Sequence, residues 1–277
     1  MKTALLQLCS GDDPQENLVQ TKELIAEASS AGAEFVLTPE VTNCVSTSRE
    51  HQQNVLSFED QDLTLRALRE QASELDLWVL IGSLALKAQD QDGRFANRSF
   101  LISPDGSICA KYDKIHMFDV CVSETETYKE SAGYRPGRCA ITCDTPFGCV
   151  GLTVCYDLRF PKLYRSLAKA GADFLTVPSA FSPVTGDAHW EALLRARAIE
   201  TGCYVLAPAQ TGEHSSSVGR PRQTYGHSMV VGPWGDVLAD AGTDVGVVQV
   251  EINKTTVSNA RKRIPSLTCE TRFSGPK

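Results

Sequence analysis

The sequence predicts an α/β fold of four layers, an α-β-β-α sandwich built from two similar halves. Two observations carry this prediction: the chain contains a weak internal repeat, and each half alternates apolar strands with amphipathic helices. A sheet that is covered by helices on one face keeps a second apolar face, and packing the two sheets together buries both. Residues 1–277 are therefore expected to form one domain.

The internal repeat consists of three pairs of segments that occur in the same order in both halves. The first pair is AGAEF at 31–35 and AGADF at 170–174, followed by Pro39 and Pro178 respectively. The other pairs are 77–80 with 203–206 and 99–108 with 228–237. The alternative is two independent doubly wound domains, but no linker rich in Pro, Gly or Ser separates the halves.

The first half reads as strand, helix, strand, helix, strand and β-hairpin. Asp13 can cap the first helix, Pro14 suits its first turn, and Gly32 ends it. The second helix carries an apolar stripe at helical spacing: Leu65, Leu68, Ala72 and Leu75. The expected strands are 4–9, 35–38, 77–84, 98–103 and 107–112, with a turn at 104–106. The second half repeats this order from a strand at 150–155, with helices near 161–170 and 188–201.

The composition indicates a globular protein that binds neither nucleic acid nor membranes. Apolar residues make up 42% of the chain and charged residues 22%, and the formal net charge is −7. A negative chain lacks the basic field that nucleic acid and anionic membranes require. No apolar run approaches the roughly 18 residues of a membrane span. The N-terminal segment lacks the features of a signal peptide, so a cytoplasmic location is expected.

The ten cysteines are expected to be reduced thiols, as is usual in the cytosol. Cys139, Cys143 and Cys149 form the closest group, but no nearby His or Cys completes a zinc set. We therefore expect no metal and no cofactor, and the useful question is which single cysteine is reactive.

Three polar residues fall at the carboxyl ends of predicted strands, where sites gather in α/β sheets. They are Glu40, Lys114 and Cys155. A thiol, a carboxylate and an ammonium together can carry out acyl transfer, because the thiolate attacks, the carboxylate moves protons and the cation stabilises the oxyanion. A cysteine at a strand end is more often a buried hydrophobe, however, and an isolated Glu or Lys in a loop is usually solvated. The pattern alone leaves the question open.

The segments around these residues resemble the three signatures of the nitrilase superfamily of carbon–nitrogen hydrolases. They are LTPE at 37–40, YDKIH at 112–116 and CYDLRFP at 155–161, in the family's order. The resemblance extends from about residue 2 to about residue 265. It implies the sandwich fold and a small-molecule amide substrate, with Glu40, Lys114 and Cys155 as the catalytic residues.

The resemblance also implies a mechanism. Cys155 attacks the amide, Glu40 moves the protons, and Lys114 with the backbone N–H of Tyr156 stabilises the oxyanion. An acid and ammonia are released by way of a cysteine thioester. Glu130 matches the family's second carboxylate, which implies that it positions Lys114 and the substrate amide. The alternative is that Glu130 is a surface-loop acid.

Three further residues are candidates for binding the substrate. Arg159 could hold a substrate carboxylate through two parallel hydrogen bonds, or it could form a structural ion pair with Asp157 or another acid. Phe181 and Thr185 match positions that line the pocket in the small-amidase branch of the family, although both could be packing residues. A protease-like pairing of Cys155 with a histidine is a further alternative.

The segments AHWE at 188–191, RARAIE at 195–200 and YGHS at 225–228 most resemble that small-amidase branch. The branch includes deaminated glutathione amidases and ω-amidases. The resemblance implies a small amide with a carboxylate, with deaminated glutathione as the first choice and α-ketoglutaramate as the alternative. Hydrolysis of a nitrile or an N-carbamoyl group and acyl transfer to an amine remain open. So does a binding or scaffold protein that has lost the chemistry.

Two segments depart from the branch pattern. Residues 213–224 form a longer segment than usual, which could be a lid, a partner contact or a mobile loop. The tail after Leu267 lacks the usual basic cluster. Family tails often lie across a dimer interface, so a homodimer or a higher homo-oligomer is expected, with weaker support at this point.

Overall fold

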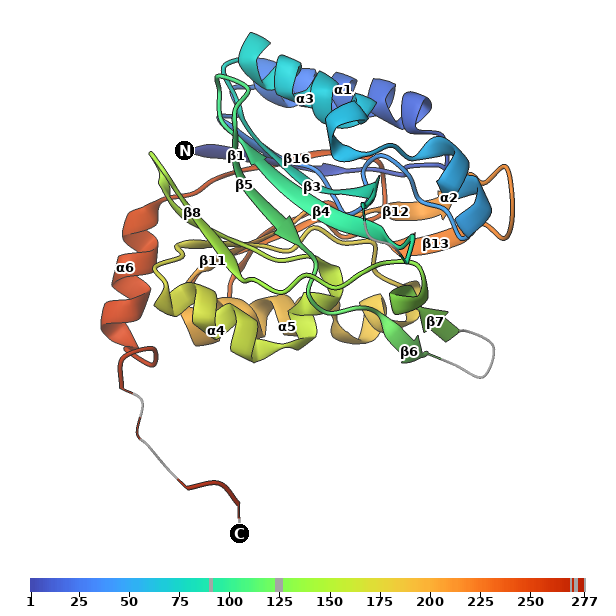
Figure 1. The fold of residues 1–277 in the computed structure, drawn as a ribbon. Helices are drawn as coiled ribbons and strands as arrows, with labels where there is room; N and C mark the ends of the chain where they lie inside the picture. The colour runs from blue at the N-terminus through green and yellow to red at the C-terminus, as the bar shows by residue number, and fades with distance from the viewer. Residues whose placement is uncertain (90–91, 123–126, 270, 272–273, 277) are drawn as a thin grey trace.

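Two six-stranded β-sheets lie face to face among residues 1–89, 92–122, 127–269, 271 and 274–276, which the computed structural model describes (Figure 1). The first sheet has the order β16 (Gly246–Glu251), β1 (Lys2–Gln7), β2 (Phe35–Leu37), β3 (Trp78–Lys87), β4 (Phe95–Ile102) and β5 (Ile108–Asp113). The second has the order β15 (Val237–Asp240), β14 (Met229–Val231), β11 (Tyr204–Ala207), β10 (Phe174–Thr176), β9 (Gly148–Leu152) and β8 (Ile141–Thr145).

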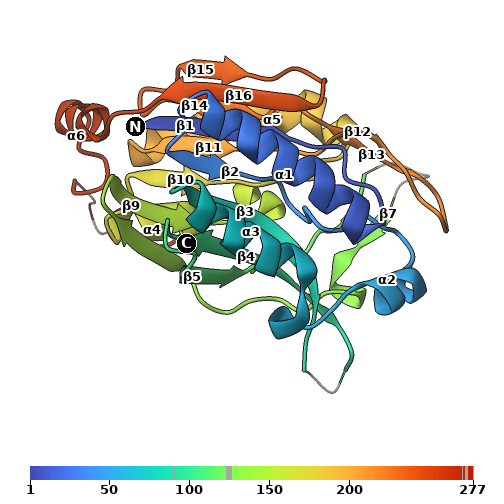
Figure 2. The same ribbon diagram turned by 90° about the horizontal axis from the view of Figure 1, so that it is seen from above.

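Helices cover the outer face of each sheet, so the predicted four-layer sandwich is confirmed. The helices α1 (Pro14–Ser30) and α3 (Leu63–Glu74) lie over the first sheet, and α4 (Pro161–Lys169) and α5 (Pro183–Thr201) lie over the second (Figure 1). Asp13 caps α1 by accepting a hydrogen bond from the Gln15 N–H at 2.8 Å. Two further helices, α2 (Arg49–Val55) and α6 (Lys254–Arg263), lie at opposite ends of the sandwich (Figures 1 and 2).

The internal repeat corresponds to a repeated strand order. Strands β1 to β5 follow one another across the first sheet, as β9, β10, β11, β14 and β15 do across the second. The three segment pairs fall on matching elements, and the hairpin β4–β5 has its counterpart in β14–β15. Each half also has an outer strand that pairs antiparallel with its first strand, β16 with β1 and β8 with β9. The sequence pattern did not reveal these outer strands, because β16 returns from the end of the chain to the first sheet.

The predicted strand at 150–155 is too long. Strand β9 ends at Leu152, and Cys155 instead begins a short 3-10 helix, η3 (Cys155–Arg159). The cause is Asp157, whose carboxylate accepts the Val154 N–H at 2.9 Å while its own N–H donates to the Val154 carbonyl at 3.1 Å. This local turn closes before the strand can continue. The first strand was likewise placed two residues late, since it spans Lys2–Gln7 rather than 4–9, and α5 begins at Pro183 rather than at 188.

The core between the sheets is apolar and continuous. Leu37 and Leu80 from the first sheet belong to the same buried cluster as Leu152 and Leu206 from the second. A separate buried cluster fills the space between the first sheet and its helices. The two sheets are therefore held in a fixed relation, which matters because the candidate catalytic residues come from both.

The chain comes close to itself at Gly82 in β3. A Cβ atom at this position would lie 1.9 Å from the carbonyl oxygen of Thr38 and 2.4 Å from Cβ of Pro178. Only glycine fits, because the loops after β2 and β10 both press against β3 here. These are the two loops that carry the repeated prolines, so the pseudo-symmetric halves meet at this point.

Several connections gather at one end of the sandwich. They are α2, the hairpin of β6 (Asp119–Cys121) with β7 (Thr127–Lys129), the 3-10 helix η2 (Glu130–Ala132), and the hairpin of β12 (Thr211–His214) with β13 (Arg222–Tyr225). Figures 1 and 2 both show α2, β7 and the β12–β13 hairpin at the same end. The remaining short 3-10 helix, η1 (Glu59–Gln61), precedes α3. The gathered connections enclose the candidate site.

Candidate active site

A cavity of about 460 Å³ opens at this end of the sandwich. Its wall includes Glu40, Lys114, Glu130 and Cys155, the predicted catalytic residues, which come from four separate segments of the chain. The segments that follow β2, β5 and β9 supply three of them, with Cys155 at the start of η3, and η2 supplies Glu130. A cavity that holds several ionisable groups is the usual form of a small-molecule site.

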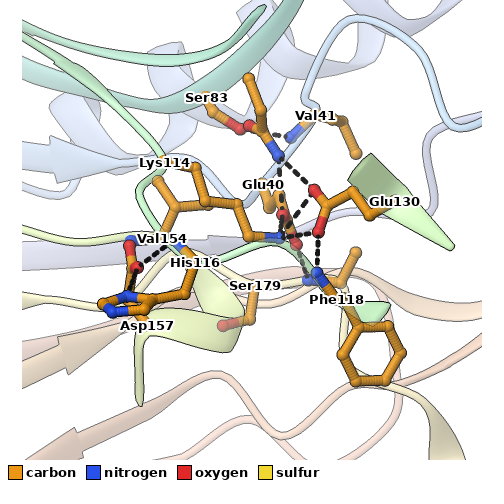
Figure 3. Close-up of polar contacts among 12 residues, drawn as sticks. Glu40, Val41, Ser83, Lys114, His116, Phe118, Glu130, Val154, Asp157 and Ser179 are labelled. Atoms are coloured by element: carbon orange, nitrogen blue, oxygen red, sulfur yellow. Dashed lines mark hydrogen bonds and ion pairs between the residues drawn. The ribbon is translucent and has the colours of Figure 1, made fainter. Parts of the chain in front are cut away.

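The Lys114 ammonium is the centre of a buried charge cluster (Figure 3). Its Nζ lies 2.9 Å from Oε1 of Glu40, and 2.9 and 2.8 Å from the two carboxylate oxygens of Glu130. Lys114 is 2% exposed. Burial lowers its pKa, but the two carboxylates outweigh burial and raise the pKa well above its ordinary value. Lys114 is therefore a fixed cation.

Glu40 is held from several sides. Its Oε2 accepts the N–H of Ala180 at 2.9 Å, and its Oε1 accepts both Lys114 and the side-chain amide of Asn97, each at 2.9 Å. Burial acts to raise the pKa of Glu40, but Lys114 and Arg222 outweigh it, so the pKa is lowered. The Glu40 carboxylate is thus ionised and fixed in orientation.

Cys155 is 7% exposed and lies at the first position of η3. Its N–H donates to the carbonyl of Pro178 at 2.9 Å. Burial and the negative charge of Glu40 raise the pKa of the Cys155 thiol, and Lys114 only partly opposes them. The thiol is therefore the resting form, and a base is needed to activate it.

The backbone conformation is unusual at Cys155 and at the residue that follows Glu40. Val41, which follows Glu40, has a φ of 47°, and Cys155 has a φ of 49°. A β-branched residue seldom adopts this left-handed region, and such strain tends to be retained at functional sites. The Val41 N–H donates to the hydroxyl of Ser83 at 2.8 Å, which holds the turn (Figure 3).

Asp157 organises the turn that presents Cys155. It is fully buried, and its carboxylate accepts the Tyr112 hydroxyl at 2.7 Å and the Val154 N–H at 2.9 Å. His116 lies against the same carboxylate, with its Nδ1 at 2.6 Å (Figure 3). The strand β5, which leads to Lys114, is in this way joined to the turn that carries Cys155.

The histidine alternative finds no geometric support. His116 lies against Asp157 and stacks on Phe160, with ring centroids 3.5 Å apart. His189 contacts the guanidinium of Arg159 at 3.3 Å. Among the residues that the structure describes, no histidine contacts the Cys155 thiol.

The predicted substrate-binding residues divide into two groups. Tyr156, Phe181 and Thr185 line the cavity. Arg159 does not; its guanidinium lies over the ring of Phe181 at 5.5 Å and that of Tyr156 at 6.0 Å. The alternative ion pair of Arg159 with Asp157 does not form within the described part of the chain either. Arg159 therefore supports two cavity walls from behind.

The site also contains Asn97, Ala180 and Arg222, which the sequence pattern did not predict. Asn97 and Ala180 were ordinary members of a strand and a loop, and only the tertiary fold brings them to Glu40. Arg222 lies in the unusual segment 213–224, in which no single residue was expected to have a role. That segment is an ordered hairpin, since β12 pairs with β13 and the Ser217 N–H and hydroxyl both donate to Asp12 at 2.7 Å.

The described residues also bear on the expectations about membranes and metals. No helix among them has the length and apolar character that crossing a membrane requires. No group of three or more His, Cys, Asp or Glu side chains among them is arranged to hold a metal ion.

Comparison with known proteins identifies the family. The chain is 40% identical over 265 residues to the deaminated glutathione amidase of Yersinia enterocolitica, covering 95% of this chain and 91% of that protein. The crystal structure of the C. elegans NitFhit protein superposes with a TM-score of 0.89 at 36% identity, over 97% of this chain and 64% of that longer one. Saccharomyces cerevisiae Nit3, a member of branch 10 of the nitrilase superfamily, gives a TM-score of 0.86 at 29% identity, over 99% of this chain and 97% of its own.

The sequence pattern of the family described as carbon-nitrogen hydrolase matches residues 2–262, nearly the whole chain. This agrees with the resemblance drawn from the three motifs and with the observed sandwich. The chain therefore belongs to the carbon–nitrogen hydrolase family of the nitrilase superfamily.

Proposed function

We propose that the chain is an amidase of the deaminated glutathione amidase type, with Cys155 as its nucleophile. The observation that carries this proposal is the buried contact of Lys114 with Glu40 and Glu130 beside a buried thiol, in a cavity of small-molecule size. A scaffold protein that had lost the chemistry would have no need to keep this charge cluster dry, since buried charges are costly to maintain.

In the proposed first step, Glu40 takes the proton of the Cys155 thiol while the sulfur attacks the amide carbonyl carbon. The lowered pKa of Glu40 and the raised pKa of Cys155 fit these roles, because the base is ionised and the nucleophile keeps its proton until attack. The tetrahedral intermediate then collapses. Its C–N bond breaks, and Glu40 returns the proton to the leaving nitrogen.

The thioester that remains is hydrolysed by the reverse use of the same base. Glu40 takes a proton from water, the hydroxide attacks the thioester carbonyl, and the sulfur leaves and recovers its proton. Lys114 and the Tyr156 N–H are proposed to stabilise the oxyanion in both steps. The Tyr156 amide lies in the first turn of η3, where backbone N–H groups have no partner within the helix. One such donor is worth about 3–4 kcal/mol in comparable sites.

Glu130 is proposed to position Lys114. Its carboxylate contacts the ammonium through both oxygens and is itself held by the Phe118 N–H at 2.6 Å. Bidentate contact fixes direction as well as distance. Among the remaining predicted residues, Tyr156, Phe181 and Thr185 are proposed to contact the substrate as walls of the cavity.

The proposed substrate decides the leaving group. Ammonia leaves only from a primary amide, such as α-ketoglutaramate. Deaminated glutathione has peptide-type amides, so its hydrolysis releases an amine instead. For this substrate the expected release of ammonia is therefore wrong on chemical grounds. The ω-amidase reaction on α-ketoglutaramate stays as the alternative.

The test measures both products. Purified enzyme is given deaminated glutathione or α-ketoglutaramate, and the released amine and ammonia are each quantified. We expect amine release from deaminated glutathione to dominate and to disappear in the Cys155→Ala variant. Cys109→Ala is the matched control, because Cys109 is an exposed thiol that does not line the cavity. A folded enzyme that releases neither product, or a Cys155→Ala variant that keeps full activity, would contradict the proposal.

Three further features belong to this proposal. We infer that residues 1–277 act as one unit, because the cavity takes residues from both halves. A homodimer or higher homo-oligomer in the cytoplasm is proposed on the family resemblance. The expected tail lies partly outside the described residues, at 270, 272–273 and 277. Sedimentation velocity and fractionation of cells test these features, and a strictly monomeric enzyme would refute the oligomer.

A further inference from the structure

Arg222 is a cation in the cavity wall that has no carboxylate partner among the described residues. It lies at the start of β13 and is half-buried. Its Nη2 donates to the carbonyl oxygen of Ala180 at 2.6 Å, while its buried Nε has no hydrogen-bond partner in the described part of the chain. None of the ion pairs among the described residues includes Arg222. A guanidinium that is partly removed from water is stabilised when it pairs with an anion.

The other cations of the cavity wall are already engaged or exposed. Lys114 is held by Glu40 and Glu130. Arg49 is exposed and donates to the backbone carbonyls of Ala132 and Gly93. Lys129 is exposed at the end of β7. Arg222 is thus the one cation of the described wall that is both half-buried and without a carboxylate.

The position of Arg222 is close to the proposed chemistry. Ala180 accepts Arg222 through its carbonyl and donates its N–H to Glu40 at 2.9 Å. One residue therefore separates the guanidinium from the base, a span of a few ångströms. A carboxylate bound at Arg222 would lie only a few bonds from a carbonyl carbon placed against Cys155.

We propose that Arg222 binds the carboxylate on the acyl side of the amide substrate. This inference rests on the proposed amidase function and deepens it by naming the residue that selects a carboxylate-bearing acyl group, with the anion held by the β12–β13 hairpin. Arg159, the residue that the sequence suggested for this role, stacks on Tyr156 and Phe181 instead and does not line the cavity. The unusual segment 213–224 then acts as a specificity element.

The kinetic test compares glutaramate, the monoamide of glutaric acid, with its neutral methyl ester, and follows ammonia release from each. Arg222→Gln keeps a donor for the Ala180 carbonyl but removes the charge. We expect Arg222→Gln to reduce kcat/KM for glutaramate by about 10- to 100-fold and to leave kcat/KM for the methyl ester unchanged. The reason is that only glutaramate has a carboxylate that forms a charged hydrogen bond with Arg222. Arg159→Gln and Arg49→Gln are the matched controls, and both should leave the ratio of the two substrates unchanged.

A second measurement does not depend on turnover. Glutarate is titrated into the Cys155→Ala variant by calorimetry, with and without Arg222→Gln. We expect Arg222→Gln to weaken binding by a similar 10- to 100-fold. An inactive wild-type enzyme that still binds glutarate through Arg222 would refute the amidase while retaining the anion site.

Three results would overturn the inference. Equal losses with the acid and the ester would show that Arg222 acts through Ala180 and Glu40 rather than on the substrate. If Arg159→Gln instead lowered kcat/KM for glutaramate relative to that for the methyl ester, the carboxylate would be assigned to Arg159. Glutarate binding that is absent, or that does not depend on Arg222, would remove the site.

Discussion

The Lys114 ammonium lies 2.9 and 2.8 Å from the two carboxylate oxygens of Glu130, so one acid holds this cation through both of its oxygens. Glu40 contacts the same nitrogen through one oxygen at 2.9 Å. The cluster therefore carries two negative charges against one positive charge. Because this balance raises the pKa of Lys114 despite its burial, Lys114 can stabilise negative charge but cannot act as a base.

Replacing Glu130 with glutamine keeps the shape of the side chain and removes its charge. Lys114 would remain paired with Glu40 but would be held less firmly, so the oxyanion donor would be misdirected. We expect kcat to fall by about 100-fold with little change in KM, because the interaction is used mainly in the transition state. Steady-state kinetics of Glu130→Gln and of the exposed control Glu251→Gln measure this. A change confined to KM would instead indicate a contact with the bound substrate.

The ionisation of Glu40 and Cys155 predicts a broad pH optimum. Burial acts to raise the pKa of Glu40, but the nearby cations lower it below its ordinary value of 4.5. The acid limb of kcat/KM should therefore lie below pH 4.5, and activity should be level from about pH 5 to pH 8. The sign follows because Glu40 must be deprotonated to act, while the pKa of Cys155 is raised and its thiol persists.

The measurement is a pH profile with a substrate that does not titrate in this range, with circular dichroism to exclude unfolding at each pH. A limb near pH 6 to 7 would point to a histidine base and would contradict the assignment of Glu40.

Asp157→Asn should damage both stability and rate. The buried carboxylate accepts hydrogen bonds from Tyr112, Val154 and His116, and an amide can accept at only one of its two terminal atoms. We expect a loss of about 2–4 kcal/mol in the free energy of unfolding, since a buried charged network is broken. Denaturant unfolding measures this loss.

A matched control is Asp144→Asn, which changes an exposed carboxylate of the edge strand β8. We expect the residual folded Asp157→Asn enzyme to have a lower kcat, because the turn that presents Cys155 is loosened. Unchanged stability would mean that the network contributes little.

Gly82→Ala tests the close approach of the two halves. The added methyl group would meet the Thr38 carbonyl and Pro178, neither of which is a flexible side-chain end. We expect destabilisation by about 3 kcal/mol or more, together with lost activity as the loop carrying Glu40 is displaced. Gly246→Ala in β16 is the matched control, because a methyl group added there would meet no atom within 4 Å. Equal melting temperatures for the two variants would contradict this account.

The layers of the fold could be predicted because they depend on local pattern. The same pattern located the three central site residues near strand ends, and the family resemblance implied their catalytic roles. The repeat was visible since β2 and β10, with their following prolines, lie in segments of similar sequence. Glu40 and Lys114 follow strands closely, so their position at the sheet end needed no tertiary information. Cys155 was located in the right region but in the wrong element, because Asp157 turns the chain early.

The remaining parts of the site could not be predicted from local pattern. Ala180 contributes only backbone atoms to Glu40 and Arg222, and a backbone contact leaves no trace in side-chain type. Arg222 reaches the cavity because β12 and β13 form a hairpin. The polar segment between these strands contains no pattern that predicts their pairing. Arg222 lines the cavity and Arg159 does not, and only the tertiary fold decides this difference.

Strand β16 pairs with β1 along its whole length, from Lys2 with Glu251 to Gln7 with Gly246. The ribosome makes β1 well before β16, so one edge of the nascent first strand stays unpaired until β16 emerges. Exposed strand edges are templates for intermolecular pairing. The newborn chain is therefore prone to aggregate until β16 has emerged, and truncation before residue 246 would leave this edge of β1 exposed permanently.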